Sequence, residues 1–104
     1  MRSIVVLGGG GHAKVIIGAA RAAGFAVRAV YDDAPERHGS MVLGVRVEGP
    51  TAEAPREGLP TVIAVGDNRA RKRMAELPCE WLSLVHPNAW VHDSVRMGAG
   101  TVVF

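Results

Sequence analysis

The stretch IVVLGGGGHA, residues 4–13, decides the fold of this chain. Its first four residues form an unbroken β-branched and aliphatic run, which is typical of a strand buried on both faces of a parallel sheet. Four glycines follow, and apolar residues then recur at helical spacing at Ala13, Ile16, Ile17, Ala20 and Ala23. We therefore predict a buried, central strand, a glycine turn and a helix that packs on the sheet.

The glycine turn carries a pattern that favours phosphate binding. Gly8, Gly10 and Ala13 fit the spacing of the dinucleotide-type fingerprint, in which glycines allow a tight turn and a close backbone approach to a ligand. The helix that begins here would present free N–H groups and a partial positive charge to a diphosphate. His12 is unusual in such a loop, and it could form a hydrogen bond with a phosphate or a sugar group. The candidate ligand-binding residues are Gly8, Gly9, Gly10, Gly11 and His12. The alternative is a glycine turn needed only for geometry, followed by a solvated histidine.

Two further predicted strands end in polar loops. The strand at 26–31 is followed by Asp32 and Asp33, and the strand at 61–65 is followed by Gly66, Asp67 and Asn68. Because the carboxyl ends of parallel strands meet at one edge of a sheet, we expect both loops to lie beside the glycine turn. A carboxylate there can accept hydrogen bonds from a ribose hydroxyl or a base N–H. The alternative for the two aspartates is a simple polar turn.

A second helix is predicted after the strand at 61–65. Asp67 or Asn68 can cap it, and Pro78 ends it. Its apolar line is formed by Ala70, Met74 and Leu77. Its basic residues are typical of a solvated face, and Arg71 is the one that we retain as a candidate site residue. A fourth strand is predicted at 81–85, and the proline-rich segment 34–60 is predicted as a loop with a possible short hairpin at 41–47.

From residue 85 onward the chain follows a six-residue repeat. The repeats are headed by Val85, Val91, Met97 and Val103, and their fifth places hold Ala89, Val95 and Thr101. This spacing is typical of a parallel β-helix built from short flat faces, and its alternative is an apolar strand pair with accidental spacing. A solenoid needs about three stacked repeats to become stable. We therefore expect residues 85–104 to be the start of an incomplete β-helix.

The composition favours one compact domain with an appendage. The 104 residues are 48% hydrophobic and carry a formal net charge of +2, without the long basic stripe that would point to nucleic acid. Cys79 is the only cysteine, which excludes an intrachain disulfide, so we expect a cytoplasmic protein. We expect no membrane span, because no apolar run approaches the roughly 20 residues that one needs. His86 and His92 have no partner at metal-ligand spacing, and no nucleophile, base and acid form a set. We therefore expect neither a metal site nor catalytic residues.

Four ordered blocks of the sequence resemble the N-terminal part of the PglD-type sugar acetyltransferases. These are bacterial enzymes of the hexapeptide-repeat family that acetylate amino or hydroxyl groups of nucleotide-activated sugars or sialic acids. The blocks are VLGGGGHAKV (6–15), YDD (31–33), AVGDNRARK (64–72) and LVHPNA (84–89). The resemblance implies a small Rossmann-like parallel sheet with flanking helices at residues 1–84, which holds a nucleotide sugar, usually a UDP-sugar. It implies that residues 8–12 face the diphosphate and the sugar, Asp32 and Asp33 the nucleoside, and residues 66–68 with Arg71 the remaining wall.

The same resemblance implies that residues 85–104 begin the first coil of a left-handed β-helix. In the family, the catalytic histidine, its acidic partner and the acetyl-CoA contacts lie in later coils, and the β-helix forms a homotrimer. None of these residues has a counterpart here, so we expect an excised or truncated nucleotide-sugar-binding module that is inactive alone. Acetyl-CoA and a homotrimer are expected only for the complete β-helix.

Two other functions stay open on the sequence alone. The glycine loop by itself permits an NAD(P)-binding oxidoreductase or redox-sensor domain. The apolar edge at 97–104 permits a non-catalytic domain that assembles with partners.

Overall fold

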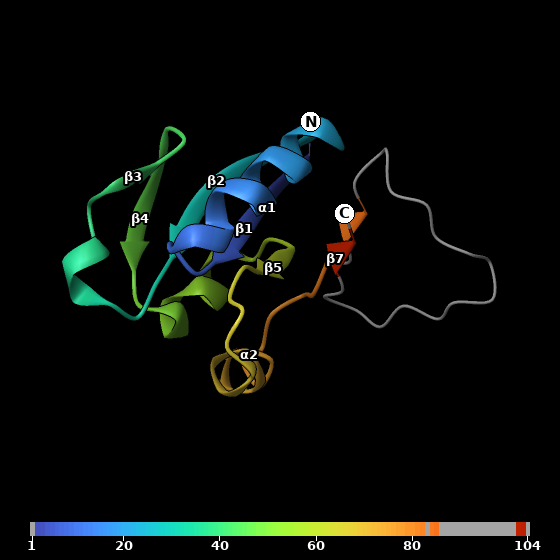
Figure 1. Ribbon diagram of the computed structural model, residues 1–104. Helices are drawn as coiled ribbons and strands as arrows, with labels where there is room; N and C mark the ends of the chain where they lie inside the picture. The colour runs from blue at the N-terminus through green and yellow to red at the C-terminus, as the bar shows by residue number, and fades with distance from the viewer. Residues whose placement is uncertain (1, 83, 86–101, 104) are drawn as a thin grey trace.

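A computed structural model describes residues 2–82, 84–85 and 102–103 of the chain, and Figure 1 shows their arrangement. Five strands form one sheet in the order β3-β4-β2-β1-β5. They are β1 (Arg2–Leu7), β2 (Phe25–Tyr31), β3 (Met41–Val42), β4 (Val45–Gly49) and β5 (Thr61–Ile63). The helices are α1 (Gly11–Ala22) and α2 (Asn68–Met74), with two 3-10 helices, η1 (Pro35–Arg37) and η2 (Thr51–Glu57). The predicted α/β fold is therefore confirmed.

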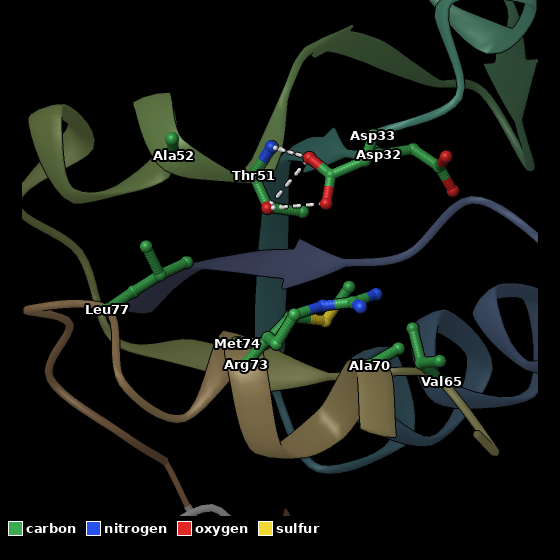
Figure 2. A pocket seen from close by; sticks show the side chains of 9 residues that line it. All are labelled: Asp32, Asp33, Thr51, Ala52, Val65, Ala70, Arg73, Met74 and Leu77. Atoms are coloured by element: carbon green, nitrogen blue, oxygen red, sulfur yellow. Dashed lines mark hydrogen bonds between the residues drawn. The ribbon is translucent and has the colours of Figure 1, made fainter. Parts of the chain in front are cut away.

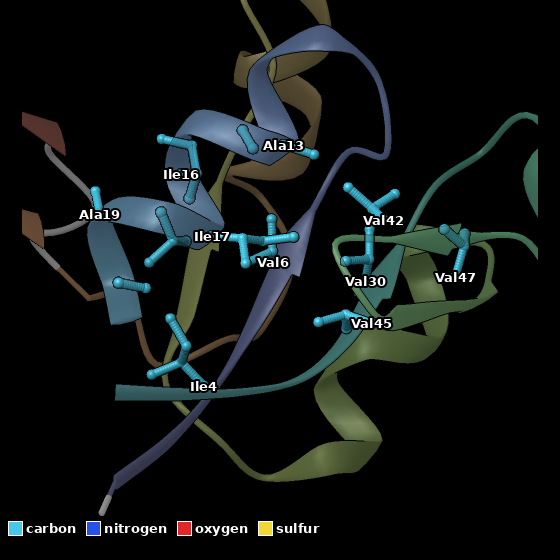
Figure 3. Close-up of a cluster of buried hydrophobic side chains, with 13 residues drawn as sticks. Ile4, Val6, Ala13, Ile16, Ile17, Ala19, Val30, Val42, Val45 and Val47 are labelled. Atoms are coloured by element: carbon cyan, nitrogen blue, oxygen red, sulfur yellow. The ribbon is translucent and has the colours of Figure 1, made fainter. Parts of the chain in front are cut away.

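Strand β1 lies between two apolar cores. It pairs in parallel with β2 on one side and with β5 on the other. Ile4 and Val6 belong to the cluster beneath α1, which Figure 3 shows, whereas Val5 and Leu7 belong to the cluster that includes side chains of η2 and α2. All four side chains are fully buried. Burial on both faces explains why the run at 4–7 has no polar residue, and it confirms the predicted strand.

Helix α1 packs on the sheet with the face that the sequence predicts. Ala13, Ile16, Ile17 and Ala20 are buried against the sheet, and Ala23 is partly buried at the end of the helix. The alanines are short enough to let the helix approach β1 closely. None of the helices in the described part of the chain is long and apolar enough to cross a membrane.

The hairpin predicted at 41–47 is present, and it extends the main sheet. Leu43 and Gly44 connect β3 to antiparallel β4 with positive φ angles of 47° and 79°, the two-residue geometry that matches strand twist. Strand β4 continues to Gly49 and pairs in parallel with β2. Val42, Val45 and Val47 are buried in the cluster beneath α1. The prediction of irregular loop on either side of this hairpin was wrong for η1 and η2, and β4 continues beyond the predicted bound at residue 47 to Gly49.

The third parallel strand and the second helix are shorter than predicted. Strand β5 ends at Ile63 and not at residue 65, because its partner β1 ends at Leu7, whose carbonyl accepts the last bond from the N–H of Ala64. Helix α2 ends at Met74, four residues before Pro78. Beyond it the chain continues in tighter turns, in which the N–H of Glu76 donates to the carbonyl oxygen of Arg73 and the N–H of Leu77 donates to that of Met74. The apolar line survives this change, since Met74 is buried and Leu77 packs partly against the same cluster.

The single strand predicted at 81–85 is wrong, because this segment divides between two partners. Trp81 forms one parallel bridge with Thr61, whereas β6 (Leu84–Val85) pairs in parallel with β7 (Val102–Val103). Val85 pairs with Val103, eighteen residues later, which equals three of the predicted six-residue repeats. The other repeat positions lie outside the described residues.

Gly8 is the position where the fold depends most on glycine, and this gives a first prediction. Its φ is +106°, and a Cβ there would lie 2.6 Å from Cγ2 of Val65 and 3.0 Å from the carbonyl oxygen of Ala64. Gly8→Ala should lower the free energy of unfolding by about 2 kcal/mol or more, because it combines backbone strain with a clash. Urea denaturation followed by circular dichroism measures this change.

Gly18→Ala is the matched control, since Gly18 lies within α1 and a Cβ there meets no atom within 4 Å. It should raise the free energy of unfolding by roughly 0.5–1 kcal/mol, because alanine favours the helix over glycine. Equal stability of Gly8→Ala and the wild type would contradict the described geometry of the loop.

Candidate functional site

Three loops meet at one edge of the sheet, beyond the carboxyl ends of its central parallel strands. Residues 8–10 follow β1, Asp32 and Asp33 follow β2, and residues 64–67 follow β5. These strands are neighbours in the sheet and run parallel. The structure thus brings together the loops that the sequence nominated, at the edge where open α/β sheets bind ligands.

The glycine loop is fixed to β2 and opens onto the start of α1. The N–H of Gly8 donates to the carbonyl oxygen of Tyr31 at 2.6 Å, and the N–H of Gly9 donates to Oδ2 of Asp32, also at 2.6 Å. Gly10 is the N-cap residue of α1, and among the described residues no side chain caps this helix or places an acid in its first turn. The first N–H groups of α1 are therefore available to an anion.

Asp32 holds the glycine loop in place. Its side chain is buried, with Oδ1 accepting from the N–H of Ala34 at 2.7 Å and Oδ2 accepting from Gly9 and from Nη1 of Arg37 at 3.0 Å. Burial alone would raise the pKa of Asp32, but the hydrogen bonds from Gly9, Ala34 and Arg37 outweigh it and lower that pKa. Both oxygens are thus engaged within the chain, so the geometry gives Asp32 a positioning role.

The Asp33 carboxylate points away from that of Asp32, although both residues line a larger pocket. The Asp33 carboxylate accepts hydrogen bonds from the N–H of Thr51 at 2.9 Å and from Oγ1 of Thr51 at 2.9 Å and 3.1 Å. The pocket has a volume of about 420 Å³. Figure 2 shows Asp33 and Thr51 on one side of it and Arg73 and Met74 of α2 on the other. This volume lies within the range of small-molecule sites.

His12 and Arg71 line a second, smaller pocket beneath the start of α1. This pocket has a volume of about 220 Å³, and its floor is formed by the end of β5. A Cβ on Gly66 would lie 2.8 Å from Nε2 of His12, so the absence of a side chain there makes room for the imidazole. Nη1 of Arg71 donates to the carbonyl oxygen of Val65 at 3.3 Å. The structure therefore brings together three residues that the sequence nominated from separate segments.

Asp67 and Asn68 lie outside both of these pockets. Asp67 is the N-cap residue of α2, and its Oδ1 accepts from the N–H of Arg69 at 2.8 Å. The sequence alone allows either Asp67 or Asn68 as the cap, and in the structure the cap is Asp67. Both side chains are exposed, and neither is among the lining residues. Their contact with a ligand stays a prediction, and the structure gives Asp67 a capping role.

Sequence reasoning missed Arg37, Thr51 and Arg73. Arg37 pairs with Asp32, and a Cβ on Gly10 would lie 3.2 Å from its Nη1. Thr51 binds Asp33, and Arg73 faces the larger pocket. The first two lie in the segment predicted as loop, where only proximity to the aspartates in sequence could have suggested them. No group of three or more His, Cys, Asp or Glu that could hold a metal ion occurs within the described ranges.

The bonding of Asp32 predicts a characteristic dependence of stability on pH. Because its pKa is lowered in the folded state, Asp32 stabilises the fold above its unfolded pKa of about 3.9, and this contribution is lost as the pH falls below that value. Asp32→Asn should lower the free energy of unfolding by about 1–3 kcal/mol at pH 7, and by less at pH 3. Denaturation curves of both proteins at the two pH values measure the difference.

Asp67→Asn is the control, because asparagine caps a helix as well as aspartate does. Its effect should stay within about 0.5 kcal/mol at pH 7. A deficit of Asp32→Asn that is the same at pH 7 and pH 3 would contradict the assigned role of the charge.

Solved structures of two acetyltransferases are similar to the chain over nearly its whole length. A mutant of perosamine N-acetyltransferase from Caulobacter crescentus, in complex with CoA and GDP-perosamine, is 38% identical with a TM-score of 0.81, over 97% of this chain and 50% of that one. The acetyltransferase domain of PglB from Neisseria gonorrhoeae, in complex with acetyl coenzyme A, is 33% identical with a TM-score of 0.76, over 97% and 52%. The chain thus spans about half the length of these proteins.

Two other proteins are less similar to this chain. RSP, a Rex-family repressor solved in complex with NADH, is 12% identical with a TM-score of 0.58, over 98% of this chain and 52% of that one, which shows the fold alone. An uncharacterized protein of Acanthamoeba polyphaga mimivirus is 27% identical over 97 residues, which make up 90% of this chain and 19% of that protein.

The family itself is shown by the sequence. A sequence model of the PglD N-terminal domain matches residues 3–77, which include β1, α1, the hairpin, β5 and α2. This span contains all three loops at the sheet edge and both pockets. The chain therefore belongs to the PglD N-terminal domain family.

Proposed function

We propose that this chain binds a nucleotide sugar at the edge formed by residues 8–12, Asp33 and Gly66, and that it serves as the acceptor-binding module of a sugar O- or N-acetyltransferase. The observation that carries the proposal is the uncapped start of α1 in the loop after β1, because β1 lies between β2 and β5 and the loops after those two strands line the two pockets. A relative that is 38% identical to this chain has been solved with GDP-perosamine and CoA, which supports the same class of ligand here.

The diphosphate belongs at the glycine loop. The N–H groups at the start of α1 carry partial positive charge, and no acidic residue occupies the first turn. His12 and Arg71 line the neighbouring small pocket and add donors for a phosphate or a sugar hydroxyl. Gly8 and Gly9 are used to shape the loop, so the contacts with the ligand come from Gly10, Gly11 and His12.

The nucleoside belongs in the larger pocket. Asp33 keeps acceptor capacity beside its bonds to Thr51, because a carboxylate offers about four acceptor sites. Val65, Met74 and Leu77 provide an apolar surface for a base or ribose, and Arg73 stands at the same pocket. The family resemblance implies a UDP-sugar, whereas the Caulobacter relative was solved with GDP-perosamine. The binding experiments below therefore include both a uridine and a guanosine nucleotide sugar.

Acetyl transfer needs an acyl donor held in line with the acceptor group and a base beside it. We propose that both lie in β-helix coils beyond these 104 residues and that residues 85–104 begin the first coil. The parallel pairing of Val85 with Val103 supports this assignment, because the two residues are separated by three of the predicted six-residue repeats. The acetyl-CoA site and a homotrimer are part of the same proposal for the complete acetyltransferase.

Thermal denaturation with ligands tests the proposed function. Either UDP-N-acetylglucosamine or GDP-mannose should raise the Tm of the 104-residue chain, since a ligand that binds only the folded state adds about 2.7 kcal/mol of stability at one hundred times its Kd. Acetyl-CoA and NADH should leave the Tm unchanged.

Two variants of α2 provide the matched comparison. Arg71→Ala removes a cation that lines the small pocket, and Arg69→Ala removes an exposed cation from the same helix. The first should reduce the shift in Tm and the second should preserve it. A chain that responds to NADH but to neither nucleotide sugar would refute the proposal and support the nicotinamide alternative.

A further inference from the structure

Arg37 stands against the glycine loop although it comes from η1, far from the loop in sequence. Its Nη1 lies 3.0 Å from Oδ2 of Asp32 and would lie 3.2 Å from a Cβ on Gly10. The side chain is 47% exposed, so one face meets the loop and another meets solvent. Within the described part of the chain, its other guanidinium nitrogens make no hydrogen bond. Arg37 therefore has free donors directed to the surroundings of the loop.

The charge of Asp32 creates a difficulty for an anionic ligand at this loop. Oδ2 of Asp32 lies 2.6 Å from the nitrogen of Gly9, so a buried negative charge lies close in the chain to the N–H groups of Gly10, Gly11 and His12 that would hold a diphosphate. At such short range, and with little water between them, like charges repel strongly. A cation near the loop would offset this repulsion, and Arg37 contacts Asp32.

We infer that Arg37 binds the diphosphate of the nucleotide sugar, with its guanidinium bridging Asp32 and a phosphate oxygen. One edge of the guanidinium donates to Oδ2 of Asp32, which fixes its orientation, and the other nitrogens donate to the ligand. Arg37 thus offsets the charge behind the loop and adds a charge-assisted hydrogen bond in front of it. This inference rests on the proposed function, because it concerns the diphosphate of the same ligand.

A purely structural role for Arg37 makes a different prediction. If the guanidinium only held η1 and the loop in place, its removal would disturb the whole sheet edge and weaken nucleoside and nucleotide sugar alike. If it binds the diphosphate, only ligands with phosphate groups lose affinity. The ratio of the two affinities therefore separates the two roles.

Isothermal titration calorimetry on the full 104-residue chain tests the inference. The ligands are UDP-N-acetylglucosamine and GDP-mannose, with uridine and guanosine as the ligands without phosphate. Arg37→Ala should raise the Kd of the bound nucleotide sugar by about ten- to a hundredfold, the usual range for a hydrogen bond to a charged group. The Kd of the matching nucleoside should change by no more than about twofold. The Kd of Arg37→Lys should fall between those of the wild type and Arg37→Ala, because lysine keeps the positive charge but lacks the paired N–H donors of the guanidinium.

Arg28→Ala is the matched control. Arg28 is also a half-exposed arginine paired with a carboxylate, 3.8 Å from Glu48 with 54% exposure, but it lies within β2 and away from the loop. It removes the same charge and should change the Kd of the nucleotide sugar by less than about twofold. Equal Kd values for wild type and Arg37→Ala, or equal losses for nucleoside and nucleotide sugar, would overturn the role of Arg37 alone. A wild-type chain that binds neither nucleotide sugar would overturn the proposed function and this inference with it.

Discussion

A buried carboxylate joins the ends of the two neighbouring strands from which the site is built. Asp32 accepts from the N–H of Gly9 and thereby ties the loop after β1 to the end of β2. The bond from Gly8 to Tyr31 adds a second link, and the space around Gly8 is so limited by Ala64 and Val65 that a Cβ would not fit there. These short contacts fix where α1 begins, and hence where its free N–H groups point.

The same constraint divides the polar residues of the edge by task. The Asp32 carboxylate and the N–H of Gly9 already form hydrogen bonds within the chain that hold the loop in place, so they are poorly placed to bind a ligand as well. Gly10 and Gly11 lie at the uncapped start of α1, His12 lines the smaller pocket and Asp33 lines the larger one. An anion at the loop would lie close to the negative charge of Asp32. Arg37, a half-exposed cation that contacts Asp32, would reduce the repulsion between the two.

The sequence predicts the central elements well because each carries a strong local signal. The apolar run at 4–7, the glycines and the helical spacing up to Ala23 agree with one another, and all appear in the structure. The sheet edge was predictable because parallel strands place their carboxyl ends together. The partners Arg37 and Thr51 were not, since they lie in a proline-rich segment whose strand β4 is specified by burial beneath α1 more than by local propensity. The different roles of Asp32 and Asp33 also depend on their partners, Gly9 for the first and Thr51 for the second. Two adjacent aspartates look the same in the sequence, so their partners could not be predicted from it.

Binding of a nucleotide-sugar diphosphate at the edge around the glycine loop would be visible in the amide groups of that loop. Two-dimensional NMR, with UDP-N-acetylglucosamine or GDP-mannose titrated into the labelled chain, measures the chemical-shift changes of these amides. The largest changes should fall on the amides of Gly10, Gly11 and His12, with further changes around Asp33 and Gly66, and little change in the β3–β4 hairpin. Changes confined to the hairpin or to the outer face of α1, or no saturable change with either ligand, would contradict diphosphate binding at this loop.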